Sequence, residues 1–366
     1  MKIRLISLSK KFSKSILLTL CFFMLFSCAT TVNVRLTRPA QLDLNGARTI
    51  AVLPFKPGQY YVEYDTSLGK TILINTFYQI FDIKNPDEQL ALESLRTQIE
   101  RGLLDSPYIK LVSSDAVERA LKNGSLNPAD VYLTGEVSYF DISDHRGEEK
   151  KLIKPETDEH KAEYAIVPYW VREVSLVFRY QVVDSSSDKV IAYDAYRCNV
   201  SSSRIESRKA MPSAYSLLES DIKKAAKKIL QELQPYTVTK SIKLLESKTK
   251  DKSLKERMKA ADELADNSML EKASAEFTKI YEETGLVEAG YNAAILQEAL
   301  GNLSLAEEMM LEVYQRYPDN RVAKGLDDIR YEINQANRLN KQISASEASG
   351  DLDDLDDFDD SEDLDF

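Results

Sequence analysis

Hydrophobic and polar positions along the first half of the chain predict strands and helices in turn. A β-rich run over 49–55 indicates a first strand, and Asn85 followed by Pro86 indicates the start of a helix. Residues 108–112 then indicate a strand, and residues 114–124 a short helix. The first helix has one apolar face, because hydrophobic residues recur at every fourth position: Ala91, Leu95, Ile99 and Leu103.

Three further strands and a long helix complete this region. Apolar residues alternate over 131–140 and 173–184, and a polar turn joins the second run to 189–200, which predicts a hairpin. The charged stretch 141–161 indicates a loop. An apolar stripe predicts a helix over 213–233. The order β-α-β-α-β-β-β-α predicts an α/β or α+β sandwich, in which helices pack on a mixed sheet.

The pattern changes to helical spacing over 252–341, which predicts a second, all-α domain after a first domain at 47–235. The stretch between them, 236–251, is rich in lysine, serine and threonine and indicates a linker. Within it, Val238 and Ile242 also fit an edge strand.

The run Tyr291-Asn292-Ala293-Ala294, with a glycine and a proline further on, resembles a tetratricopeptide repeat (TPR). Ala273 and Ala306 are 33 residues apart, close to the repeat length of about 34, although Gln297 replaces an aromatic residue and Gly285 a proline. The resemblance implies a short helical solenoid whose first helices line a groove for a partner peptide around Leu264, Asn292 and Gln297. It implies packing positions at Ala261, Ala273, Phe277, Ala294, Gly301, Ala306 and Pro318.

The first 28 residues have the composition of an export signal. Five basic residues and no acid precede an almost wholly apolar run over 15–26, and the segment ends with Ser27 and Cys28. This order resembles the lipobox of bacterial lipoproteins, and the alternative is an ordinary secretory signal or membrane anchor. The resemblance implies a signal peptide at 1–27, acylation of Cys28, for example with palmitate, and a tether at 28–46. Ala29 in place of aspartate favours the outer membrane over the inner one.

The first domain also resembles two related families of the bacterial envelope. Residues 50–55, Ile-Ala-Val-Leu-Pro-Phe, and the run 131–137 are similar to segments of the curli-secretion lipoproteins and of the amino-terminal domain of TolB-like proteins. The resemblance extends over about residues 48–235. It implies an α/β fold and an envelope location rather than an activity.

Charge narrows the range of partners. Five of the 48 basic residues lie in the signal, which leaves 43 against 59 acids. Such a chain is not expected to bind nucleic acid. Ten of the acids fall within 351–366, so residues 342–366 are expected to form a disordered acidic tail. The alternative is that the leucines and phenylalanines of this tail dock on a basic partner surface.

Motifs for catalysis, metals or cofactors are missing from the sequence. The two histidines, His145 and His160, lack the spacing of a zinc site. Gly69-Lys70-Thr71 ends like a phosphate-binding loop, but Tyr64 stands where its first glycine belongs. Cys198 is expected to be a lone, buried thiol. We therefore expect no catalytic residue, no metal and no cofactor.

Two functions fit these features. The favoured one is a lipid-anchored envelope protein that acts as a non-catalytic adaptor or assembly factor, held to the membrane by acyl chains and to a partner protein by the TPR groove. The alternative is a subunit of an oligomeric curli-type outer-membrane secretion channel, in which the aromatic segment 60–83 would insert in the membrane. The sequence leaves the oligomeric state open, and an enzyme with an unrecognised site is a third interpretation.

Overall fold

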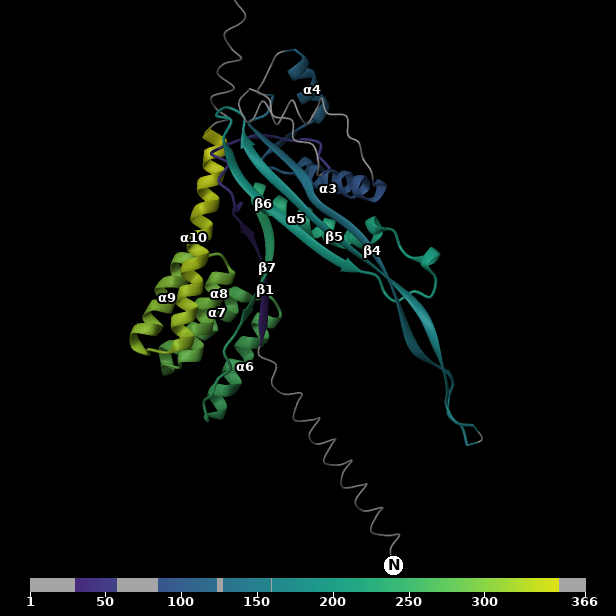
Figure 1. The fold of residues 1–366 in the computed structure, drawn as a ribbon. Coiled ribbons are helices and arrows are strands. Elements are labelled where there is room, and N and C mark those ends of the chain that lie inside the picture. Colours follow the sequence, from purple (N-terminus) through teal and green to yellow (C-terminus); the bar gives the residue numbers. More distant parts are fainter. Residues whose placement is uncertain (1–29, 58–84, 124–127, 159, 349–366) are drawn as a thin grey trace, which may run out of the picture. The chain divides into compact units, whose positions relative to one another are not determined.

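The computed structural model describes residues 30–57, 85–123, 128–158 and 160–348, which belong to two compact units (Figure 1). The sheet unit comprises the described residues of Pro39–Tyr236 and Leu339–Phe366. The helical unit comprises those of Met1–Arg38 and Thr237–Arg338. Neither unit is one continuous stretch of chain, because each also takes in a piece from near an end of the chain.

The sheet unit contains a mixed sheet of five strands in the order β3-β2-β4-β5-β6. Strand β2 lies parallel to β3 and β4, whereas β4, β5 and β6 run antiparallel. The predicted mixed sheet and element order are thereby confirmed. The elements are β2 (Thr49–Val52), α3 (Pro86–Leu104), β3 (Lys110–Val112), α4 (Ser114–Lys122), β4 (Val131–Lys154), β5 (Glu163–Asp184), β6 (Val190–Ser201), the 3₁₀ turn η1 (Arg208–Ala210) and α5 (Ala214–Leu233).

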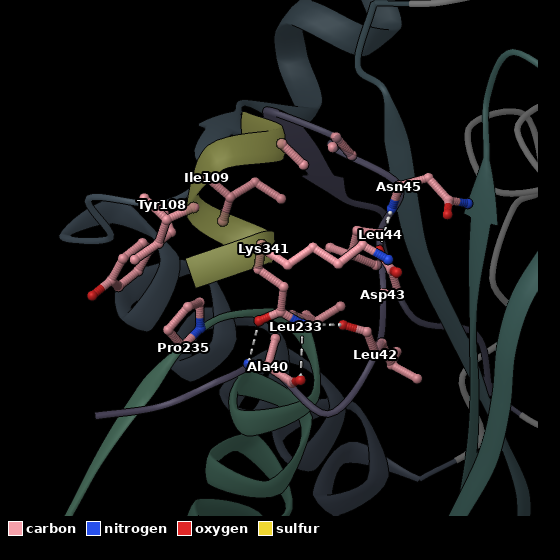
Figure 2. A pocket seen from close by; sticks show the side chains of 15 residues that line it. Ala40, Leu42, Asp43, Leu44, Asn45, Tyr108, Ile109, Leu233, Pro235 and Lys341 are labelled. Carbon is pink, nitrogen blue, oxygen red and sulfur yellow. Dashed lines mark hydrogen bonds between the residues drawn. The ribbon is translucent and has the colours of Figure 1, made fainter. Parts of the chain in front are cut away.

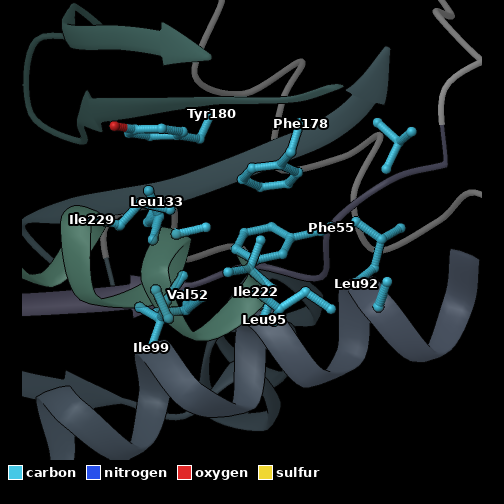
Figure 3. Close-up of a cluster of buried hydrophobic side chains, with 14 of the residues drawn as sticks. Val52, Phe55, Leu92, Leu95, Ile99, Leu133, Phe178, Tyr180, Ile222 and Ile229 are labelled. Carbon is cyan, nitrogen blue, oxygen red and sulfur yellow. The ribbon is translucent and has the colours of Figure 1, made fainter. Parts of the chain in front are cut away.

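Helices α3 and α5 supply the apolar cover of one face of this sheet, and α4 packs against the other. The side chains of Asn85 and Ser213 cap α3 and α5 by accepting hydrogen bonds from the first-turn backbone amides. Figure 3 shows the main core, where the rings of Phe55 and Phe178 meet edge to face with centroids 4.9 Å apart. The buried stripe of α3 therefore fixes that helix on the sheet, as its four-residue spacing predicts.

Strands β4 and β5 form a hairpin that continues beyond the partners β2 and β6, where the sequence analysis predicts a loop. The charged stretch 141–154 is strand, and it pairs with residues 163–175 of β5. His145 lies opposite Val171 in this arm and is 57% exposed. The loop prediction was wrong because an arm with little burial on either face needs no apolar alternation, which is the signal that identifies strands in sequence.

The helical unit combines five helices with a two-stranded sheet of β1 and β7. Consecutive helices from α6 to α9 pack on one another, and α10 adds apolar residues to the same core. No helix in the described part of the chain is long and apolar enough to cross a membrane. The elements are β1 (Thr31–Arg38), β7 (Tyr236–Lys243), α6 (Lys252–Asp266), α7 (Leu270–Thr284), α8 (Val287–Ala299), α9 (Leu303–Arg316) and α10 (Asn320–Ala348).

The division of the chain differs from the expected tether at 28–46 and linker at 236–251. Residues 31–38 form β1, and residues 236–243 form β7. Strand β7 contains Val238 and Ile242, the two residues that fit an edge strand in the sequence. Val32, Val34 and Ile242 are buried in the core of the helices, with polar residues between them on the outer side. Each of these strands has one face covered by the helices, which the composition of the two stretches does not indicate.

Candidate partner-binding site

The predicted site residue Asn292 binds the chain's own backbone. It lies on α8 with 0% of its surface exposed. Its Oδ1 accepts a hydrogen bond from the Leu245 amide at 2.7 Å, and its Nδ2 donates to the Leu245 carbonyl at 3.0 Å. Leu245 lies two residues beyond the end of β7. A side-chain amide that pairs with both backbone groups of one residue recognises a peptide chain without regard to its side chain.

The other two predicted site residues have different surroundings. Gln297 donates to the Ser274 hydroxyl at 2.8 Å and accepts from Asn302 at 2.8 Å, so it joins α7, α8 and the turn before α9. Leu264 is partly buried and packs against the apolar core. The structure therefore does not assemble Leu264, Asn292 and Gln297 around one ligand position.

A buried cluster of four charges fixes the two strands to the helices, and sequence reasoning missed it. Lys240 of β7 donates to Glu298 of α8, and to Glu332 of α10 at 2.9 Å. Arg38, the last residue of β1, forms a two-pronged pair with Glu332, and its Nη2–Oε1 distance is 2.8 Å. Glu298 and Glu332 are only 2% and 6% exposed. Two positive and two negative groups thus lie together in the helical unit.

Burial and pairing act in opposite directions on these carboxyl groups. Burial raises the pKa of Glu298 more than the bond from Lys240 lowers it. Burial also opposes the ionisation of Glu332, but the bonds from Arg38 and Lys240 together outweigh it and lower the pKa. The second oxygen of Glu298 is buried and has no hydrogen-bond partner among the described residues. Glu332 is therefore the centre of the cluster, and the pairing of Glu298 is incomplete.

The position of these acids within apolar stripes is the only sequence signal that could have pointed to them. Glu298 follows the buried residues Ala294 and Ile295 at helical spacing, and Glu332 follows Ile329. Charged residues are rarely buried without a partner, so an acid in such a stripe predicts a cation nearby. The sequence does not show which cation it is.

The predicted TPR packing positions lie inside the helical unit or at its turns. Gly301 has a φ of 85°, a left-handed conformation that suits glycine just after the end of α8. Pro318 lies between α9 and α10. The remaining positions are fully buried: Ala261, Ala273, Phe277, Ala294 and Ala306.

The sheet unit has a separate pocket of about 310 Å³ (Figure 2). Residues 40–47, Tyr108, the end of α5 and the last turns of α10 line it. The Gln342 side chain holds this wall together, because its Oε1 accepts from the Ala40 amide at 2.9 Å and its Nε2 donates to the Ala40 carbonyl at 3.1 Å. Asp43 and Lys341 are its charged residues. They do not form a recognisable catalytic arrangement.

The other residues considered for chemistry lie apart from these sites. Cys198 is a free, buried thiol in β6, as predicted, and burial raises its pKa to about 11. Within the described ranges, no three histidine, cysteine, aspartate or glutamate residues are grouped so as to hold a metal ion. His160 is exposed. Cys28, the segment 60–83 with Gly69-Lys70-Thr71, and residues 349–366 of the predicted tail lie outside the described residues. Residues 342–348, which the prediction places in the same disordered tail, instead form the last turns of α10.

Comparison with known proteins defines no family for this chain. No protein-family model matches it, and no curated protein matches it. Among solved structures it is similar to PelC from Paraburkholderia phytofirmans, a dodecamer, with 16% identity, 56% of this chain and 98% of that chain covered, and a TM-score of 0.25. It is also similar to the lipoprotein GNA1162 from Neisseria meningitidis, with 12% identity, 50% and 97% coverage, and a TM-score of 0.23. These neighbours are bacterial, and they share little sequence with this chain.

Proposed function

We propose that this protein is a lipid-anchored, non-catalytic adaptor of the bacterial cell envelope, whose helical unit binds an extended segment of a partner protein. The observation that carries the proposal is the way in which the unit holds residues 237–245 of its own chain. Asn292 binds the backbone of Leu245, and Glu298 with Glu332 binds the ammonium group of Lys240. These are the contacts that an extended peptide ligand would use.

The contacts define the class of segment that fits. The amide of Asn292 needs only a peptide bond, whereas the two buried carboxylates need a basic side chain five residues before it. Ile242 and Leu244 between them are buried, so two aliphatic side chains are also required. We therefore propose as partner an extended segment with a lysine or arginine followed by two alternating aliphatic residues.

The partner segment would bind by taking the place of residues 237–245. Removing Ile242 and Leu244 from the core costs about 1.5–3 kcal/mol for each side chain. A partner that makes equivalent contacts restores this energy, but it competes with a segment whose covalent attachment gives it a high effective concentration. Binding is thus expected to be slow and to require a segment that closely resembles 237–245.

A disulfide across the two strands tests this mode of binding. Ser241 donates to the Asn33 side chain at 2.6 Å, so these exposed residues face each other. In the double variant Asn33→Cys and Ser241→Cys, oxidation would lock β7 to β1. We expect envelope proteins cross-linked to the reduced variant to be absent from the oxidised one. Each single variant serves as the control.

The outcomes of this experiment separate the parts of the proposal. Equal capture of the same partner in both redox states would place the binding surface away from residues 237–245. Failure to capture any envelope protein with the wild-type chain, in either state, would contradict the adaptor function.

The proposed anchor at Cys28 has its own test. Cells that express the protein are labelled with a palmitate analogue, and the protein is recovered from membrane fractions. We expect label on the wild-type chain, in the outer-membrane fraction, and none on Cys28→Ala. A label that persists on Cys28→Ala would contradict acylation at Cys28.

A subunit of an oligomeric secretion channel is the second candidate. The observation in its favour is the β4–β5 arm, which exposes apolar side chains suited to a neighbouring subunit or to lipid: Leu152, Ile153, Tyr164 and Ile166. The mass of the detergent-extracted mature protein, measured by size exclusion with light scattering, tests it. A closed ring of many subunits would favour the channel, whereas a monomer or dimer would contradict it.

A further inference from the structure

One backbone hydrogen bond joins the first described residue, Thr30, to the helical unit. The Leu244 amide donates to the Thr30 carbonyl at 2.9 Å, so the chain is part of the fold from Thr30 onward. The proposed lipid-bearing residue, Cys28, precedes Thr30 by two positions. In the sequence, an anchor at Cys28 would be separated from the first described residue, Thr30, by Ala29 alone.

The chain next to this contact is basic, although the protein is acidic as a whole. Residues 243–259 contain seven basic residues and three acids, whereas the formal net charge of the whole chain is −11. Figure 1 shows that β1 begins, and that the chain runs from β7 into α6, at the same end of the helical unit. Five exposed lysines, which we call the basic surface, belong to this stretch: Lys243, Lys248, Lys250, Lys252 and Lys255.

The lysines of the basic surface differ from the paired lysines elsewhere on the molecule. None of the five forms an ion pair with another described residue. On α5, by contrast, Lys223 pairs with Glu219 at 2.7 Å and Lys224 pairs with Asp221 at 2.9 Å. Lys248 acts electrostatically on Asp319, whose main partner is Arg321. The other four ammonium groups are exposed and are available to an external anion.

Two of these lysines lie at the amino-terminal end of a helix. Lys252 and Lys255 lie in the first turns of α6, directly after the acidic N-cap Asp251, whose side chain accepts hydrogen bonds from the Ser253 and Leu254 amides. The amino-terminal end of a helix carries partial positive charge and favours acidic side chains. Asp251 meets this preference, so Lys252 and Lys255 add positive charge beside a cap that is already in place.

We propose that the basic surface contacts the anionic headgroups of the membrane that holds the anchor. The inference rests on the proposed acylation of Cys28, which would bring the surface to the headgroups. Electrostatic attraction to a charged surface extends about 8 Å at physiological ionic strength. Lys243 precedes Leu244, which is bonded to Thr30, and the other four lysines follow along the chain. A cluster of basic residues strengthens binding by a lipid chain that holds only weakly when alone. The helical unit would thereby be held against the lipid surface.

Vesicle binding by the mature chain without its acyl group tests the basic surface separately from the anchor. The chain that begins at residue 28 with Cys28→Ser is sedimented with vesicles of 30% phosphatidylglycerol in phosphatidylethanolamine, or of phosphatidylcholine alone. We expect binding only to the anionic vesicles and its loss in 0.5 M salt. The triple variant Lys248→Gln, Lys250→Gln and Lys252→Gln should reduce the partition coefficient on the order of a hundred-fold, since each lysine contributes about five-fold.

The matched control removes the same charge from another place. Lys223→Gln, Lys224→Gln and Lys227→Gln on α5 should change the partition coefficient by less than about three-fold, because these lysines lie outside the basic surface. Equal losses in the two triple variants, or equal binding of the unaltered chain to neutral and anionic vesicles, would overturn the proposal. Circular dichroism shows whether each variant is folded. The palmitate label reports on Cys28 alone, so failure of the anchor and failure of the basic surface are distinguished.

Discussion

The sheet unit and the helical unit differ in the polar groups that they bury. The main core of the sheet unit is apolar, and the Tyr180–Glu232 contact is the polar pair that lies buried beside it. The helical unit instead places Asn292, Glu298 and Glu332 between its helices and its two strands. An apolar face accepts many neighbours, whereas a buried amide or carboxylate accepts only a partner of matching chemistry. The comparison teaches that residues 237–245 are held in the helical unit by groups that require a specific partner as well as by apolar contacts.

Removal of the central carboxylate is expected to have the largest effect. Glu332→Ala leaves Arg38 and Lys240 without a shared partner in a buried place, and should destabilise the helical unit by about 3–5 kcal/mol. Urea denaturation followed by circular dichroism measures it. The control is Glu307→Ala, which removes the exposed partner of Arg330 and should cost less than about 1 kcal/mol. Similar losses in both variants would contradict the selective role of the cluster.

Loss of the Asn292 amide is the next largest change. Asn292→Ala removes both hydrogen bonds to Leu245 and leaves its backbone groups unpaired, at a cost of about 2–3 kcal/mol. Asn302→Ala removes one exposed contact to Gln297 and should cost less than about 1 kcal/mol. If Asn292→Ala is as stable as the wild type, the amide does not hold the strand.

Loss of the polar pair in the sheet unit should lower the free energy of unfolding by a smaller amount. The Tyr180 hydroxyl donates to Glu232 at 2.6 Å, and Lys228 also approaches this carboxylate at 3.7 Å. Tyr180→Phe therefore leaves Glu232 with one partner and should cost about 1–2 kcal/mol. Tyr193→Phe, at a site that is 62% exposed, should be neutral. If Tyr180→Phe lowers the free energy of unfolding as much as Glu332→Ala does, the proposed difference between the two units is contradicted.

The smallest predicted effect depends on pH. Burial, followed by the charges of Asp266 and Glu246, raises the pKa of Asp262 in α6 to about 6. Because this value lies above that of an unfolded aspartate, about 3.9, the fold penalises the ionised form. The penalty is absent below about pH 4, grows as the pH rises through about 6, and is complete above it. Asp262→Asn should thus gain about 1 kcal/mol at pH 7 and nothing at pH 4, measured by urea denaturation at both values.

The sheet unit could be predicted from the sequence to a greater extent than the helical unit. The four-residue spacing of Ala91, Leu95 and Ile99 and the alternation along β5 are local signals, and the structure has both elements. The β4–β5 arm has no such signal because little of it is buried. Periodicity thus predicts elements that lie against a core and misses those that extend from it.

Local sequence patterns could not predict the contacts of the candidate site. Arg38 and Glu332 are 294 positions apart, and Lys240 and Glu298 are 58 apart. The TPR resemblance predicts Asn292 as a site residue but not its contact with Leu245, which lies in a stretch whose composition indicates a linker. Nothing in one sequence pairs a charge with another so far away.

Native-state hydrogen exchange tests the central claim, that residues 237–245 can leave the helical unit. The account predicts that the amides of β7 and Leu245 exchange through a partial opening of lower free energy than global unfolding, while the central amides of α8 remain protected. The Asn292→Ala variant should lower the free energy of that opening alone. If the amides of β7 and α8 exchange together, at the free energy of global unfolding in both proteins, the strand is a permanent part of the fold and the exchange mechanism is contradicted.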